Sequence, residues 1–111
     1  MTDRERRLAE NEAAFREVNE SLRYTATQGT STVPTFRLLC ECGDAGCAEF
    51  VEVTSSEYET VRATATHFIV RPGHELPGIE RVVASSDRFS VVEKRPGEPA
   101  EIARETDPRR V

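Results

Sequence analysis

Tryptophan is absent from this chain of 111 residues, and its only lysine is Lys94. Five phenylalanines and two tyrosines are its only aromatic residues, too few for the base-stacking surface of a protein that binds single-stranded nucleic acid. Acidic residues outnumber basic ones by 20 to 15, for a net charge of −5, so the chain lacks the positive surface that neutralises phosphates. We therefore expect no nucleic-acid partner.

Long apolar runs are missing as well. The start of the chain, Met1–Glu5, lacks the apolar core of a signal peptide, and no later stretch approaches the length that spans a bilayer. These two absences predict a cytoplasmic protein without a membrane partner. Hydrophobic residues make up only 37% of the chain, so a bound metal would help a core of this size.

Three cysteines stand close together in the pattern Cys-x-Cys-x4-Cys, at Cys40, Cys42 and Cys47. Their number is odd, and in a reducing compartment clustered thiols favour a metal site or redox chemistry over a structural disulfide. Residues two apart on an extended chain face the same side, which brings the first two thiols together. Gly43 and Gly46 can adopt positive φ, and the turn that they allow would return the third thiol to the others.

A tetrahedral zinc site needs a fourth ligand, and the chain offers two histidines. His74 lies between two Pro-Gly steps, at 72–73 and 77–78, which limit the freedom of its loop and so lower the entropy lost on binding. His67 opens a predicted strand, where a surface or packing role is simpler. The predicted ligands of a structural zinc ion are Cys40, Cys42, Cys47 and His74.

Other functions of the cysteine cluster are an iron–sulfur site, thiol redox chemistry, or a catalytic zinc with Glu41, Glu49 or Glu75 as the base. The stretch 74–78 does not match a metalloprotease helix, because the second histidine is missing and a proline interrupts it. We expect a non-enzymatic module for protein interaction or regulation. A redox or zinc sensor is the second interpretation, and a zinc hydrolase is the third.

The predicted fold class is α+β. Residues 3 to about 24 read as an amphipathic helix that begins with a Thr2–Glu5 capping box. We expect its apolar stripe to cover a sheet; the alternative is a coiled coil or another partner-binding surface, for self-association or for another protein. The residues of this stripe are Leu8, Phe15, Val18 and Leu22.

Beyond a polar linker at 25–34, the sequence predicts a small, mostly antiparallel sheet of four or five strands. We expect the zinc site at the tip of the first hairpin, where it ties the hairpin to the loop 72–78. We divide the chain into a helix at 1–25 and a zinc-binding part at 35–106, which together form one domain. The expected strands are 35–39, 48–54, 67–71, 79–85 and 88–95, and the expected short helices are 56–64 and 99–105.

Five segments together resemble a group of small uncharacterised actinobacterial proteins that carry a Cys-x-Cys-Gly-Asp-x-x-Cys motif. The resemblance spans nearly all of residues 8–110. It implies a self-contained domain and no known activity, substrate or partner. The segments are Asn11–Glu20, Cys40–Asp44, Glu57–Arg62, Arg71–Glu75 and Val91–Lys94.

Overall fold

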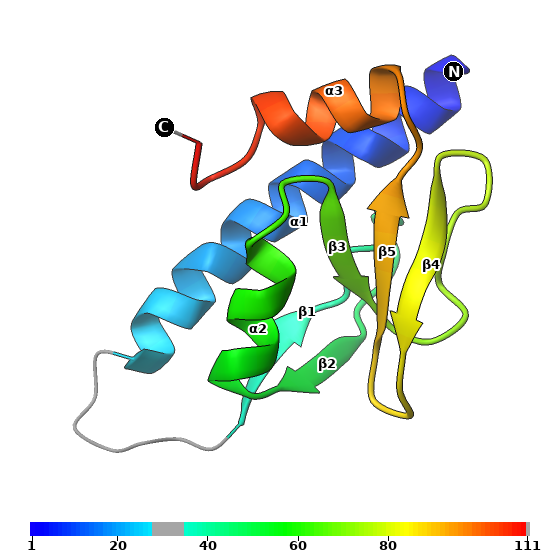
Figure 1. Ribbon diagram of the computed structural model, residues 1–111. Helices are drawn as coiled ribbons and strands as arrows, with labels where there is room; N and C mark the ends of the chain where they lie inside the picture. The colour runs from blue at the N-terminus through cyan, green and yellow to red at the C-terminus, as the bar shows by residue number, and fades with distance from the viewer. Residues whose placement is uncertain (28–34, 111) are drawn as a thin grey trace.

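The computed structural model describes residues 1–27 and 35–110 and has the predicted α+β class. Most of the predicted linker, residues 28–34, lies outside the described residues. Among the described helices, none combines the length and the apolar composition that a membrane span requires. The elements, in chain order (Figure 1), are α1 (Asp3–Thr27), β1 (Phe36–Leu39), β2 (Phe50–Val53), α2 (Ser55–Arg62), β3 (His67–Val70), β4 (Glu80–Ser85), β5 (Ser90–Lys94) and α3 (Glu98–Glu105).

The five strands form two antiparallel sheets where the sequence predicted one. One sheet pairs β1 with β2, and the other has the order β3-β5-β4. The chain turns away after β1, and one backbone bond between the Glu41 N–H and the Ile69 carbonyl, 2.9 Å long, links the two sheets there. The stretch between β1 and β2 therefore lies next to β3, as the expected metal site requires.

Two clusters of buried apolar side chains hold the sheets together. The first packs the β1–β2 hairpin against α2 and β3, and the second lies between β3, β5, α3 and the cysteines. The first cluster comprises Leu38, Val51, Val53, Tyr58, Val61, Ile69, Phe89 and Val91. The second comprises Cys40, Cys42, Phe68, Val70, Val92 and Ala103.

Helix α1 begins at the predicted capping box. The Thr2 backbone N–H donates to the Glu5 carboxylate at 2.9 Å, and the Glu5 backbone N–H donates to the Thr2 hydroxyl at 3.0 Å. The helix extends along the molecule beside α3 and β1 (Figure 1). Its C-terminal end is at Thr27, a few residues beyond the predicted end.

The prediction that the apolar stripe of α1 packs against the sheet is wrong. Val18 and Leu22 are 45% and 37% exposed, and Leu8 and Phe15 are only partly buried. Hydrophobic periodicity misplaced this face because the other elements present charged and polar partners to the helix, so its polar side chains are the ones that become buried. Among the side chains of α1 that the structure describes, the buried ones are Ala9, Glu12, Ala13, Arg16 and Asn19.

A buried ionic cluster explains in part why the polar face of α1 is the buried one. The ammonium group of Lys94 on β5 contacts the carboxylate of Glu12 on α1 and lies 2.6 Å from the carboxylate of Glu80 on β4. All three side chains are at most 1% exposed. Burial raises the pKa of the Glu12 carboxyl well above its usual range. The only lysine of the chain is therefore the cation that two buried acidic side chains share.

Candidate metal centre

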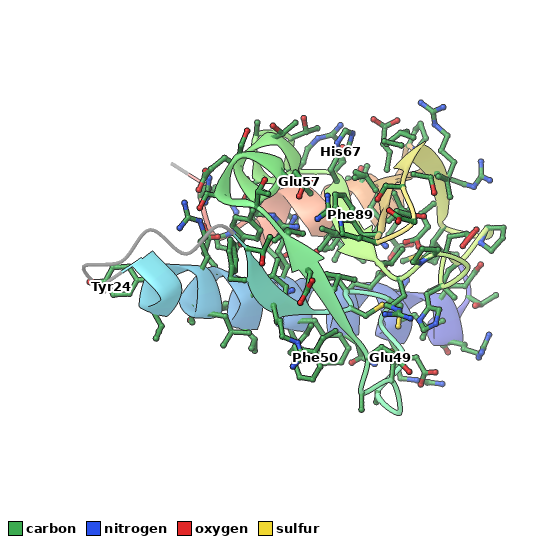
Figure 2. All side chains as sticks on the ribbon, turned by 90° about the horizontal axis from the view of Figure 1, so that it is seen from below. Tyr24, Glu49, Phe50, Glu57, His67 and Phe89 are labelled. Carbon is green, nitrogen blue, oxygen red and sulfur yellow. The ribbon has the colours of Figure 1, made fainter. Side chains whose placement is uncertain are left out.

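The structure brings the four predicted ligands together. The three thiols are free, and their sulfurs and an imidazole nitrogen of His74 all lie within 4.8 Å of one another. In Figure 2 the sulfur atoms gather beside α1, near the labelled Glu49. Cys40 and Cys42 are buried, whereas Cys47 and His74 are partly exposed. Such a group could hold a metal ion.

Two of its internal distances are those expected when one tetrahedral ion is bound by a thiolate and an imidazole. A Zn–S bond of about 2.3 Å and a Zn–N bond of about 2.0–2.1 Å, at the tetrahedral angle, place sulfur and nitrogen about 3.6 Å apart. The Nδ1 atom of His74 lies 3.5 Å from the Cys40 sulfur and 3.7 Å from the Cys47 sulfur. An iron–sulfur cluster distributes its ligands over several irons and so spreads them more widely. The spacing therefore fits a single ion.

Extended backbone places the first two thiols on one side of the chain. The Cys40 N–H donates to the Glu49 carbonyl at 3.0 Å, which continues the β1–β2 ladder, and the next N–H, of Glu41, donates to β3. Because neighbouring side chains alternate, Cys40 and Cys42 face the site, whereas Glu41 points into the interior.

A tight turn returns Cys47 to the other thiols. Gly43 has φ of 80°, but Gly46 does not adopt the positive φ that we expected of it. Instead, Asp44 closes the turn: its carbonyl accepts the Cys47 N–H and its carboxylate accepts the Gly46 N–H, both at 2.9 Å. An Asx-type turn of this kind closes the chain through these two bonds, so a second left-handed glycine is not needed.

His74 reaches the site from the loop after β3. The His74 N–H donates to the Arg71 carbonyl at 3.0 Å, which forms a turn around Gly73. The Arg71 N–H donates to the Cys40 sulfur at 3.2 Å and so stabilises negative charge on it. His67 instead lies at the start of β3, with its ring 3.1 Å from the Glu93 carboxylate, in agreement with a packing role.

Glu41 is held by a buried network that the sequence did not predict. Its carboxylate accepts hydrogen bonds from Arg62 at 2.8 Å, from the Asn19 amide at 2.7 Å and from the Ile69 N–H at 3.0 Å. A carboxylate with these partners is not available as a catalytic base. Glu49 is 57% exposed at its side chain, with its carboxylate 4.0 Å from Arg71. If all four residues bound one tetrahedral ion, no coordination position would be open of the kind that catalysis needs.

Two asparagines of α1 hold the metal-binding turn and its strand. The Asn11 amide donates to the Gly43 carbonyl at 2.9 Å. The Asn19 side chain donates to the Leu39 carbonyl at 2.9 Å and accepts the Leu39 N–H at 2.8 Å, as a neighbouring strand would. Asparagine is a poor helix former, so two of them inside one helix were the available signal of a tertiary role.

The environment of the thiols favours metal binding over free-thiolate chemistry. Burial raises the pKa of Cys40 and of Cys42, and the neighbouring thiols add to the rise at Cys40. A thiol with a raised pKa is protonated at neutral pH and is a weak nucleophile. A bound cation would displace these protons and keep the sulfurs as thiolates.

The turn tolerates no side chain at Gly43. A Cβ atom there would lie 2.5 Å from the Leu8 carbonyl oxygen of α1 and 2.8 Å from the Glu12 Cγ, in addition to the strain of a positive φ. Gly43→Ala is therefore expected to lower the free energy of unfolding by about 2–3 kcal/mol, from strain and overpacking together.

Urea unfolding in the presence of excess zinc measures this effect. Gly73→Ala is the matched control, because Gly73 has a similar φ of 87° and open space where its Cβ would lie. Gly73→Ala should introduce the backbone strain without the overpacking, and it should therefore lower the free energy of unfolding by less than Gly43→Ala does. Equal losses of stability for the two variants would mean that the close approach of α1 is unimportant.

Comparison of the chain with family models, with curated proteins and with solved structures found no match.

Proposed function

We propose that Cys40, Cys42, Cys47 and His74 bind one structural zinc ion, in a cytoplasmic protein that works as a non-enzymatic interaction or regulatory module. The observation that carries the proposal is the mutual approach of the four ligand atoms to within 4.8 Å. Thiolate and imidazole ligands in a tetrahedral arrangement are typical of zinc, and a site closed by four protein ligands is typical of a structural role.

The outer face of α1 supports the interaction role. Val18 and Leu22 lie one turn apart on the helix and are both substantially exposed, although they belong to its apolar stripe. A second copy of this chain or another protein would bury them. The acidic balance of the chain favours a protein partner over a nucleic acid.

A thiol or zinc redox sensor is the second candidate, because Cys47 is only partly buried and an oxidant can reach its sulfur. Because Cys40 and Cys42 are buried, the sensor function has less support than the structural role. A hydrolase has the least support, since four protein ligands would leave the metal no open position, although Glu75 beside His74 does have a carboxylate oxygen without a hydrogen-bond partner.

The assignment of His74 as the fourth ligand is tested by comparing His74→Ala with His67→Ala. We expect His74→Ala to weaken zinc retention by more than about 100-fold, because loss of an outer-shell partner alone costs about 10–100-fold. His67→Ala should retain zinc like the unmodified protein, because its ring contacts Glu93 and no cysteine.

Competition with a chromogenic chelator at matched pH measures both variants, after elemental analysis has established the metal content. Protons compete with the metal for its ligands, so affinity should also fall as the pH is lowered through the range of histidine. Equal retention of zinc by the two variants, or earlier loss from His67→Ala, would assign the fourth position to another group.

A further inference from the structure

Helix α1 is attached to the rest of the molecule in an unusual way. It is 25 residues long, yet none of its described side chains belongs to either of the two hydrophobic clusters. Among these described side chains, Ala9 and Ala13 are the only buried apolar ones, and Leu8 and Phe15 are partly buried. Burial of apolar area, the main force that holds helices onto sheets, therefore contributes little to the docking of α1.

Polar contacts take its place. The Arg16 guanidinium donates to the Ala65 carbonyl at 2.6 Å and to the Ala103 carbonyl at 2.7 Å, and it stacks 4.4 Å from the centre of the Phe68 ring. One turn away, Glu12 contacts the ammonium group of Lys94. Water can replace these partners when the helix leaves, so undocking exposes groups that hydrate well and only a small apolar area.

A second set of contacts joins α1 to the metal-binding turn itself. Gly43 lies directly against the backbone of α1 at Leu8, and its carbonyl accepts the bond from Asn11. Asn19 bonds both backbone groups of Leu39, one residue before Cys40, and also bonds the Glu41 carboxylate between two cysteines. The bonds to Gly43 and Glu41 lie within the 40–47 segment, whose conformation brings the thiols together, and the bonds to Leu39 lie directly before it.

From these contacts we infer that metal binding and the docking of α1 are coupled, so that the metal centre controls a helix that can detach. The inference rests on the proposed metal site and adds that the bound metal regulates the docking of α1. Loss of the metal lets the turn relax, which removes the partner of Asn11 at Gly43 and weakens the neighbouring bonds of Asn19, and α1 leaves while the two hydrophobic clusters keep the sheets folded. Departure of α1 uncovers the edge of β1 that Asn19 occupies.

Thermodynamic linkage makes the coupling reciprocal: if the metal strengthens docking, docking strengthens metal binding by the same factor. Asn19→Ala in the full chain is therefore expected to weaken zinc affinity by about 5–150-fold, the usual range of such couplings. Asn11→Ala, which removes a single bond to the turn, should weaken it less. Val18→Ala is the matched control, because this neighbour of Asn19 is exposed and its change should leave the affinity unaltered.

Hydrogen exchange of the full chain, followed by mass spectrometry at low temperature with a reductant, tests the release of the helix. Removal of zinc by a chelator should accelerate exchange in α1 by at least about tenfold, in line with the same coupling range. Amides of β5, which pairs with both neighbouring strands, should keep their protection.

The outcomes separate this inference from the proposed function. Protein that binds no zinc overturns both. Protein that binds zinc, but in which α1 and β5 lose protection together or α1 loses none, keeps the metal site and overturns the detachable helix. Zinc affinities of Asn11→Ala and Asn19→Ala equal to that of Val18→Ala overturn the coupling in the same way. Asn11→Ala decides the affinity test if Asn19→Ala does not fold.

Discussion

Lys94→Met is expected to lower the free energy of unfolding by about 3–5 kcal/mol, which is the usual cost of removing one partner from a buried ion pair. The substitution leaves the carboxyl groups of Glu12 and Glu80 in the interior without their cation. Glu12 can relieve part of the cost by taking up a proton, which the burial that raises its pKa favours. Thermal unfolding followed by circular dichroism should show a melting temperature lower by roughly 10–30 °C.

Two further variants make this prediction specific. Arg81→Met removes a cation from the same pair of strands, but this arginine is 62% exposed at its side chain, and its pair with Glu93 should contribute at most about 1 kcal/mol. Lys94→Met combined with Glu80→Gln should regain much of the lost stability, because Glu12 is then the one acid left without the cation and can take up a proton. If Lys94→Met costs no more than Arg81→Met, the buried cluster contributes nothing beyond an ordinary surface pair.

Removal of the metal is the other change with a large expected effect. At free zinc about 1,000-fold above the dissociation constant, an ion that binds only the folded chain adds about 4 kcal/mol to its stability. Chelation should therefore lower the melting temperature by roughly 10–30 °C. The metal-free chain should still fold at low temperature, because both hydrophobic clusters persist without the ion.

The comparison requires reduced thiols throughout, so that a disulfide does not stand in for the metal. Chelator already saturated with zinc is the control for effects of the chelator itself, and refolding with zinc should restore the original melting temperature. A reduced, metal-free chain that melts as high as the zinc-loaded one would remove the structural role of the ion.

Much of the candidate site was predictable because its causes are local. The spacing of Cys40 and Cys42 follows from the alternation of an extended chain, and a turn containing Gly43 returns the third thiol. His74 was predictable because its loop is constrained on both sides by Pro-Gly steps. The role of Gly46 was misjudged because the Asp44 side chain bonds its N–H and closes the turn without a second positive φ.

The packing of α1 was not predictable from its hydrophobic pattern. Glu12, Arg16 and Asn19 have the composition of a solvated helix face. Partners that are distant in sequence make their burial favourable, among them Lys94, the Ala103 carbonyl and Leu39. Most of the polar groups on these side chains find a partner across the fold, which lowers the cost of burying them, although Glu12 Oε2 and Arg16 Nε have none. The apolar Val18 and Leu22 are left outside as a result.

By itself, the sequence determined the α+β class, the positions of the helices and strands to within a few residues, and the candidate ligands. These features depend on propensity, capping, turn chemistry and side-chain alternation, which act over a few neighbouring residues. Only the tertiary structure decided that the strands form two sheets, that α1 packs through its polar face, and that the single lysine is buried between two acids. Such features depend on which groups, distant in sequence, come into contact in the fold. A buried charge, in particular, is stable only when a partner of opposite charge lies next to it.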